Sequence, residues 1–129
     1  MEILIVDNAP IISSRLKAMI SDANSTAIIY KAKSYKEAIE FFNESNPDVV
    51  VLDIGLPANM SVNLLKEIKA AKSKTAVIVL SIHIDTHTRL KYTSAGADFF
   101  LDKYHQFEQI TGIINSIAND KIKAEYFNT

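Results

Sequence analysis

The sequence predicts an α/β fold in which five parallel strands form a sheet covered on both faces by helices. Three runs of consecutive apolar residues carry this prediction, at residues 3–6, 49–52 and 76–80. Such runs are typical of strands buried on both faces, as in parallel sheets. The segments between the strands have helical periodicity and lengths that suit right-handed crossovers. The predicted element order is strand followed by helix, repeated five times.

The strand at residues 3–6 is followed by a helix and a second strand. The helix is expected to begin near Pro10, because the first helical turn leaves its N–H groups unpaired and proline has none to lose. The second strand is expected at residues 27–30. One face of the predicted helix is apolar and carries Ile12, Leu16, Met19 and Ile20.

The sequence marks both ends of the second helix. Ser34 and Glu37 have the spacing of a capping box, in which each side chain accepts a hydrogen bond from the other residue's N–H. The helix is expected to stop before Asn46-Pro47, since a residue that precedes proline avoids the α region. Its buried face is expected to carry Ala38, Ile39 and Phe42.

The second half of the chain alternates in the same way after the strand that ends at Asp53. The helix at residues 85–95 has a thin apolar face, so it is expected to pack least tightly, and Gly96 should end it. The chain is predicted to be one domain with a core of about residues 2–119 and a tail of about residues 120–129. Further helices are expected at residues 59–71 and from 107 onward, and strands at 76–80 and 98–101.

Composition indicates an ordinary soluble protein. Hydrophobic residues make up 48% and charged residues 22% of the 129 residues, which suits one globular domain. The net charge of -1 gives no indication of nucleic-acid or membrane binding. The sequence has no cysteine, which excludes disulfides, thiol catalysis and cysteine-ligated zinc. Without a leader-like start or a membrane-spanning apolar run, a cytoplasmic location is expected.

Polar residues end four of the predicted strands. Parallel strands place their carboxyl ends at one edge of the sheet, where open α/β folds bind ligands. Taken singly, each residue has an ordinary explanation as a turn, a helix cap or a surface charge. Together they would form a charge-balanced cluster, and this favours a functional site. The cluster consists of Asp7-Asn8, Asp53, Ser81 and Lys103.

This set of side chains suits phosphoryl transfer. Carboxylate and amide oxygens are the ligands that Mg²⁺ prefers, so Asp7, Asn8 and Asp53 are candidate ligands. Lys103 would bind a phosphoryl oxygen as a point charge, and Ser81 would donate a hydrogen bond to another. Asp53 is the most central carboxylate and would act as the nucleophile, which forms an acyl phosphate.

The segments ILIVDN, VVVLDIGLP, VIVLS and AGADFFLDK resemble, in this order and spacing, the receiver domain of two-component response regulators. The resemblance extends from residue 3 to about residue 118. It implies a flavodoxin-like (βα)5 doubly wound sheet with strand order 2-1-3-4-5. It also implies that Asp53 accepts a phosphoryl group from a histidine kinase or a histidine phosphotransfer protein, in a reaction that needs Mg²⁺ or Mn²⁺.

The resemblance also assigns roles to individual residues. Asp7 matches the first member of the family's acidic pair, and the backbone carbonyl of Gly55 would complete the metal site. Lys103 matches the family's lysine. Ser81 matches the switch hydroxyl, and Phe100 the aromatic residue that turns inward on activation. The residues that would control access to the pocket are Ile82 and His83.

Four positions depart from the family's usual pattern. Asn8 replaces the acid that usually binds the metal, so weaker Mg²⁺ binding is expected. Ile82 stands where a small residue is usual, and its bulk would narrow access to Asp53. Tyr104 replaces a proline, so no cis peptide is expected there. Phe100 has no hydroxyl to anchor an outward rotamer.

The resulting hypothesis is a stand-alone receiver that switches the binding of an output protein through the face near residues 85–119. It is expected to be a monomer or weak dimer, with no nucleic-acid or membrane partner. Slow hydrolysis of its own aspartyl phosphate is expected, but no turnover of a separate substrate. The lysines at positions 66, 69, 72 and 74 are interpreted as a solvated helix face.

The sequence was also compared with four other functions. Asn8 and Ile82 also fit a degenerate receiver that binds a partner without phosphate. A flavin carrier is disfavoured, because the loop after the first strand has an acid where a phosphate-binding loop needs Gly, Ser or Thr. A metal-dependent phosphatase would need a cap over its substrate, which the chain does not show. His83, Asp85 and His87 have a spacing that a transition metal site would also fit.

Overall fold

Five strands alternate with five helices in the computed structural model, which describes residues 1–54, 60–72, 74–82 and 84–127. The strands are β1 (Glu2–Val6), β2 (Ile28–Ala32), β3 (Val49–Asp53), β4 (Ala76–Ser81) and β5 (Phe99–Asp102). The helices are α1 (Pro10–Ala23), α2 (Tyr35–Ser45), α3 (Met60–Ala71), α4 (Thr86–Ser94) and α5 (Gln109–Phe127).

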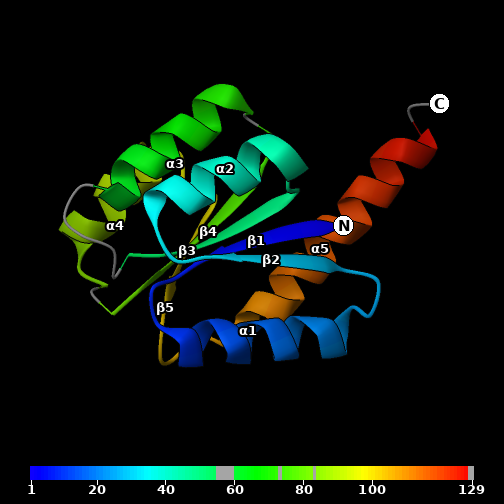
Figure 1. Cartoon of the computed structure of the whole chain (residues 1–129), viewed down its shortest axis with the longest axis horizontal. Coiled ribbons are helices and arrows are strands. Elements are labelled where there is room, and N and C mark those ends of the chain that lie inside the picture. Colours follow the sequence, from blue (N-terminus) through cyan, green and yellow to red (C-terminus); the bar gives the residue numbers. More distant parts are fainter. Residues whose placement is uncertain (55–59, 73, 83, 128–129) are drawn as a thin grey trace.

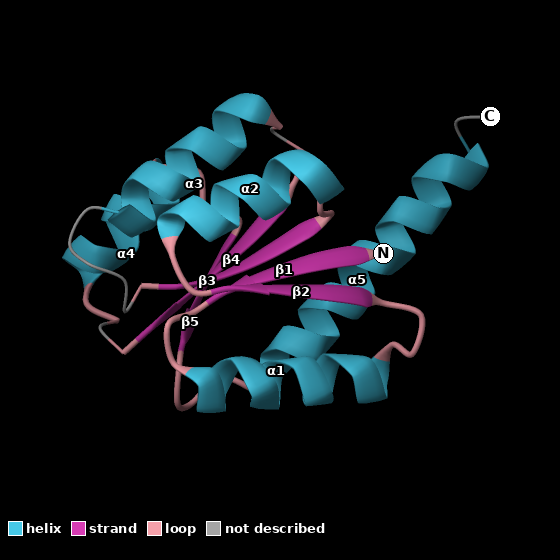
Figure 2. Ribbon diagram, in the orientation of Figure 1, coloured by secondary structure: helices cyan, strands magenta, loops and turns pink. Residues whose placement is uncertain are grey.

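The strands form one parallel sheet in the order β2-β1-β3-β4-β5. Helices α1 and α5 cover one face, and α2, α3 and α4 cover the other (Figure 1). Figure 2 shows the five strands between these two layers of helices. The predicted fold class and strand order are confirmed. Because β3 is the central strand, its carboxyl end lies in the middle of one sheet edge.

The core has two layers, one on each face of the sheet. Alternate residues of each central strand point to opposite faces. In β3, Val50 and Leu52 pack beneath α2, α3 and α4, whereas Val49 and Val51 pack beneath α1 and α5. All five residues of β3 are buried, as the run of apolar residues predicts. Each buried aliphatic side chain stabilises the fold by about 1.5–3 kcal/mol.

Helix α4 is attached to the core through few side chains. Tyr92 is its buried residue, which confirms the expected thin apolar face. Asp85 caps its first turn, with its carboxylate accepting hydrogen bonds from the Thr88 amide and hydroxyl at 3.0 and 2.8 Å. Gly96 follows the helix with a φ of 115°, a left-handed conformation that favours glycine.

The capping box at α2 differs from the prediction. Ser34 Oγ accepts from the Glu37 amide at 3.2 Å, as expected. The Glu37 carboxylate, however, accepts from the Lys33 amide at 2.8 Å and not from Ser34. The extended backbone at Ser34 brings the preceding N–H within reach of that carboxylate. Asn46 then ends the helix with a φ of 49°, before Pro47.

The bounds of β2 and the end of α5 also differ from the sequence-based expectation. Strand β2 is displaced toward the C-terminus, because its pairing with β1 extends from Ile28 opposite Glu2 to Ala32 opposite Val6. Helix α5 continues to Phe127, past residue 120 where the tail was expected to begin. Lys, Ala and Glu at positions 121–125 favour this continuation. Within the described residues, no helix combines the length and the apolar character that a membrane span requires.

Candidate functional site

Asp53 stands at the carboxyl end of β3 and is almost fully buried, with 4% of its surface exposed. Strand β1 lies on one side of β3 and β4 on the other. The amide of Ile54 donates to the Leu80 carbonyl at 3.2 Å, so the chain stays paired with β4 just past Asp53. The carboxylate is therefore held by the sheet and not by a loose loop.

Lys103 lies close to Asp53 because β5 ends beside β4. The Lys103 amide donates to the Ser81 carbonyl at 2.9 Å, which aligns the start of the β5–α5 loop with the end of β4. The Lys103 ammonium then forms an ion pair with Asp53 Oδ2. Burial alone would lower the pKa of Lys103, but the contact with Asp53 outweighs it and raises that pKa. The site therefore keeps its ammonium charge at neutral pH.

Asp7 supplies the second carboxylate of the site and is 3% exposed. Its Oδ1 accepts from the Ala9 amide at 2.9 Å. Its Oδ2 is buried and has no hydrogen-bond donor among the described residues. Burial and the negative charge of Asp53 raise the pKa of Asp7, and the Ala9 amide opposes that rise. The site therefore holds the two carboxylates of Asp7 and Asp53 and the one ammonium group of Lys103.

The structure places all five residues of the predicted cluster at the same edge of the sheet. Asp7, Asp53 and Lys103 interact electrostatically. Ser81 is 1% exposed and ends β4, directly beside the strand that carries Asp53. Asn8 follows Asp7 and is exposed to solvent. Gly55 and His83 lie outside the described residues, so their roles stay predictions.

The residues present at this edge fit a divalent cation. A buried carboxylate oxygen without a donor, beside a second carboxylate, is a place where a hard cation would relieve repulsion. The described residues contain no group of three or more His, Cys, Asp or Glu side chains placed to hold a metal ion. A cation here would therefore depend on Asp7, Asp53 and oxygen ligands of other kinds, such as the Asn8 amide and water.

A family model, the response regulator receiver domain, matches residues 3–115. This chain belongs to the receiver domain family. The chain is 29% identical over 117 residues to the chemotaxis protein CheY of Bacillus subtilis, covering 91% of this chain and 97% of CheY. It is 27% identical over 110 residues to the transcriptional regulatory protein PhoP of Escherichia coli. That match covers 85% of this chain but 48% of PhoP, so the chain spans about half the length of that curated relative.

Solved receiver structures have the same fold. The receiver domain of the Francisella response regulator 1452 is 25% identical, with a TM-score of 0.82, and the match covers 93% of this chain and 98% of that one. A signal receiver domain from Colwellia psychrerythraea is 20% identical, with a TM-score of 0.86, and shares 92% and 98% of the two chains. The latter shows likeness of fold alone.

In this receiver the aromatic residue Phe100 is turned inward, with 6% of its surface exposed. The Arg89 guanidinium carbon lies 4.9 Å from the centre of the Phe100 ring. The Tyr92 ring lies 6.2 Å from it, tilted by 36°. Arg89 and Tyr92 were missed by sequence reasoning. Their spacing of three residues, which places them on one side of a helix, was the available indication.

Exposed apolar side chains follow the carboxyl ends of β1, β4 and β5 in this receiver. Ile82, expected to narrow access to Asp53, is 55% exposed just past β4. Tyr104, directly after Lys103, is 70% exposed, and the described part of the chain contains no cis peptide bond. Ile11, at the start of α1, and Ile84, just before α4, are 82% and 49% exposed.

The alternative transition metal site is not supported by Asp85. Its carboxylate is occupied as the cap of α4, and the Thr88 amide and hydroxyl lower its pKa. His83, one of the two histidines of that site, lies outside the described residues.

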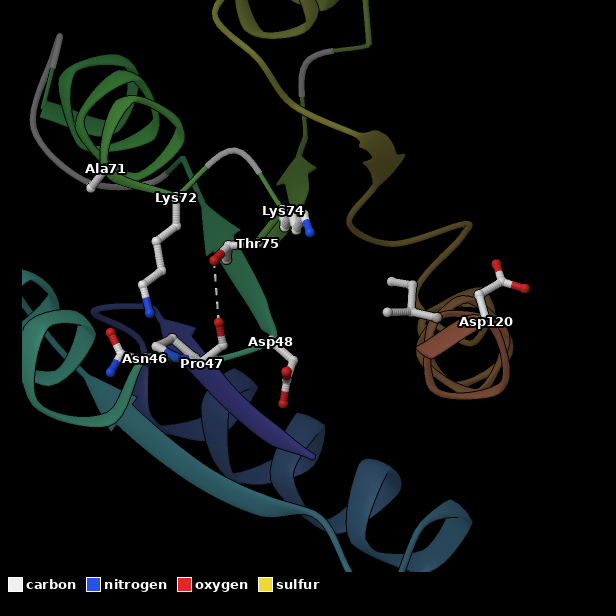
Figure 3. Close-up of a pocket in the computed structure, with 9 residues that line it drawn as sticks. Asn46, Pro47, Asp48, Ala71, Lys72, Lys74, Thr75 and Asp120 are labelled. Atoms are coloured by element: carbon white, nitrogen blue, oxygen red, sulfur yellow. Dashed lines mark hydrogen bonds between the residues drawn. The ribbon is translucent and has the colours of Figure 1, made fainter. Parts of the chain in front are cut away.

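A cavity of about 680 Å³ lies at the opposite edge of the receiver, away from Asp53. Figure 3 shows Lys72 and Lys74 on one side of it and Asp120 on α5 across the opening. Thr75 is held in its wall by a hydrogen bond to the Pro47 carbonyl at 3.3 Å. The cavity also exposes Asp48, so its lining has mixed charge and favours no single class of ligand.

Proposed function

We propose that this receiver accepts a phosphoryl group on Asp53 and thereby changes its binding to a partner protein. One observation carries the proposal: the buried Asp53 carboxylate on the central strand is paired with Lys103 and lies near Asp7, whose Oδ2 has no hydrogen-bond donor among the described residues. The excess negative charge of the two carboxylates would attract a divalent cation, and that cation together with Lys103 would offset the charge of an incoming phosphoryl group. Membership of the receiver family supports the same role.

In the proposed reaction, an Asp53 oxygen attacks the phosphorus of the donor, and the bond to the donor's leaving group breaks with its electron pair. The Lys103 ammonium, now paired with Asp53, would turn to a phosphoryl oxygen and offset its charge. Ser81 would donate its hydroxyl to another oxygen. A divalent ion held by Asp7 and Asp53, with Asn8 beside them, would neutralise charge on the phosphoryl group. Apart from slow hydrolysis of the aspartyl phosphate, no turnover is proposed.

The proposed switch connects Ser81 to Phe100 by packing. Phe100 is buried in this structure between α4 and the core, against Tyr92 and under Arg89. Movement of Ser81 toward a phosphoryl oxygen would favour this buried position over an exposed one. A population shift of this kind needs two conformations of the protein, one with Phe100 buried and one with Phe100 exposed, that differ in their affinity for the phosphoryl group. The changed surface would lie over α4, β5 and α5.

The proposed partners follow from the same role. A histidine kinase or a histidine phosphotransfer protein would be the donor, and an output protein would bind the switched face. The relatives include a chemotaxis protein matched over 97% of its length and a transcriptional regulatory protein matched over 48% of its length, so the proposal concerns the receiver domain and not the length of the whole protein.

The test is an amide NMR comparison with acetyl phosphate and Mg²⁺. Large shift changes are expected for Ser81, Phe100 and Lys103 in the wild type. The Asp53→Asn variant keeps the shape of the side chain but removes the nucleophile, so its spectrum should not change. Equal changes in both proteins would contradict phosphorylation at Asp53.

A second candidate function is a phosphate-independent binding module. The exposed Asn8, in place of an acid, favours it, because an amide contributes no charge to cation binding. The chain contains five tyrosines and no tryptophan, so tyrosine fluorescence reports a Mg²⁺ titration directly. The absence of any saturable change would favour this module over the phosphorylated switch.

A further inference from the structure

A second cavity, of about 370 Å³, lies in the groove between α3 and α4. These two helices lie next to each other on one face of the sheet (Figure 1). None of the residues that line the groove belongs to the proposed phosphoryl site. The lining residues, which define the α3–α4 groove, are Val62, Asn63, Lys66, Lys91, Ser94 and Ala95.

The polar groups of the α3–α4 groove are mainly hydrogen-bond donors. Lys66 lines the groove from α3 and Lys91 from α4, and the other polar lining residues are Asn63 and Ser94. None of the described residues that line the groove is acidic. In the described part of the chain, neither lysine has an ion-pair partner within 4.0 Å, unlike Lys103. The groove is therefore positively charged.

The charged neighbours of the groove do not neutralise it. Lys69 on α3 is directed to Asp98, with Nζ and Oδ2 2.9 Å apart. Glu67, the acid next to Lys66, accepts a hydrogen bond from the Tyr35 hydroxyl on α2. That contact turns the Glu67 carboxylate toward α2 and away from α4. Among the described residues, neither lysine therefore has a carboxylate to pair with.

We propose that the α3–α4 groove binds an acidic segment of a partner protein. Glu or Asp side chains of such a segment would reach Lys66 and Lys91 at once, and its backbone would bond to Asn63 and Ser94. Charge complementarity is the argument for this occupant. The larger cavity at the opposite edge lacks it, because carboxylates of Asp48 and Asp120 line it together with lysines.

Binding of a segment in the groove would also affect the packing of α4 against Phe100. Lys91 and Ser94 belong to α4, the helix that places Arg89 and Tyr92 against Phe100. Because α4 buries few side chains, a segment bridging α3 and α4 would change how firmly it is held. This coupling rests on the proposed function, whereas binding to the groove does not.

The test is an amide NMR titration of the full chain with a capped hexaglutamate peptide at low salt. Saturable shift changes are expected at the four polar residues of the groove. The variant K66E/K91E should weaken binding about tenfold, since it reverses both charges. The matched control K17E/K36E makes the same change in net charge at two exposed lysines on α1 and α2, and should change affinity less than about twofold.

Three results would overturn the groove as an acidic-segment site. They are the absence of saturable shifts in the wild type, an equal loss of affinity in both double variants, and tighter binding of an oligothymidine than of hexaglutamate at the same residues. The coupling between the groove and phosphorylation is tested separately. Acetyl phosphate with Mg²⁺ should change peptide affinity in the wild type and leave Asp53→Asn unchanged. An unchanged affinity in a wild type shown to be phosphorylated would overturn the coupling alone.

Discussion

At the scale of single residues, Asp7 holds a buried carboxylate oxygen without a donor in the described part of the structure. Its pKa is raised by burial and by Asp53. The folded protein therefore binds a proton at Asp7 more readily than the unfolded chain does. As a result, the free energy of unfolding falls as the pH rises from 3.8 through the raised pKa. Asp7 costs stability at neutral pH in the absence of a cation.

The substitution Asp7→Asn should therefore stabilise the protein. Without divalent cations at pH 7, the free energy of unfolding is expected to rise by about 1 kcal/mol, because a neutral amide removes the cost of burying a charge and the repulsion with Asp53. Asn keeps an oxygen for the Ala9 amide. Urea unfolding measures the change, and a Mg²⁺ titration of the same variant should show weakened binding. A loss of stability in cation-free buffer would contradict this account.

The opposite change, Asn8→Asp, adds a carboxylate at an exposed position beside Asp7. Mg²⁺ affinity is expected to increase about tenfold, which corresponds to ~1.4 kcal/mol of added attraction. Stability in cation-free buffer should change little, because solvent screens the new charge. Tyrosine fluorescence during a Mg²⁺ titration is the measurement. An unchanged affinity would mean that Asn8 does not contribute to the site.

At the scale of elements, the junction between α4 and β5 is held by Lys69 and Gly96. Lys69 Nζ bonds to the Thr75 carbonyl at 2.8 Å and to Asp98. Asp98 Oδ2 also accepts from the Val77 amide at 2.8 Å, which anchors the start of β5 to β4. Gly96 has a φ of 115°, and a Cβ there would lie 2.9 Å from Lys69 Cγ. The junction thus depends on the absence of a side chain at Gly96.

Two glycine substitutions test this description as a matched pair. Gly96→Ala should lower the free energy of unfolding by about 1–3 kcal/mol, because alanine is strained at this φ and would displace Lys69. Gly112→Ala, inside α5 with nothing within 4 Å of the new Cβ, should raise it by about 0.5–1 kcal/mol. Thermal or urea unfolding of both variants provides the comparison. Equal effects of the two substitutions would contradict the proposed role of Gly96.

At the scale of the whole molecule, much of the architecture is contained in local patterns. The run of apolar residues that ends at Asp53 predicts a central buried strand, and chain order then places Asp7, Ser81 and Lys103 at the same edge. The bounds of β2 were less predictable, because this edge strand is half exposed and its limits depend on pairing with β1. The contact of Glu37 with Lys33 depends on backbone angles that a spacing rule does not contain.

The sequence predicts which residues form the site more completely than it predicts their contacts. The residue types and the order of the strands indicate that Asp53 contacts Lys103. That Asp7 Oδ1 has a donor and Oδ2 has none among the described residues depends on the conformation of the β1–α1 loop. Arg89 over Phe100 depends on where α4 crosses β5. The α3–α4 groove arises from the packing of two helices, so its lysines appear in the sequence as ordinary solvated charges.

Phosphoryl transfer to Asp53 is tested by the intact mass of the protein after incubation with acetyl phosphate. It should be measured with and without Mg²⁺, for the wild type and for Asp53→Asn. One phosphoryl increment is expected, present only in the wild type with Mg²⁺. No increment under any condition, or the same increment in Asp53→Asn, would contradict phosphoryl transfer to Asp53.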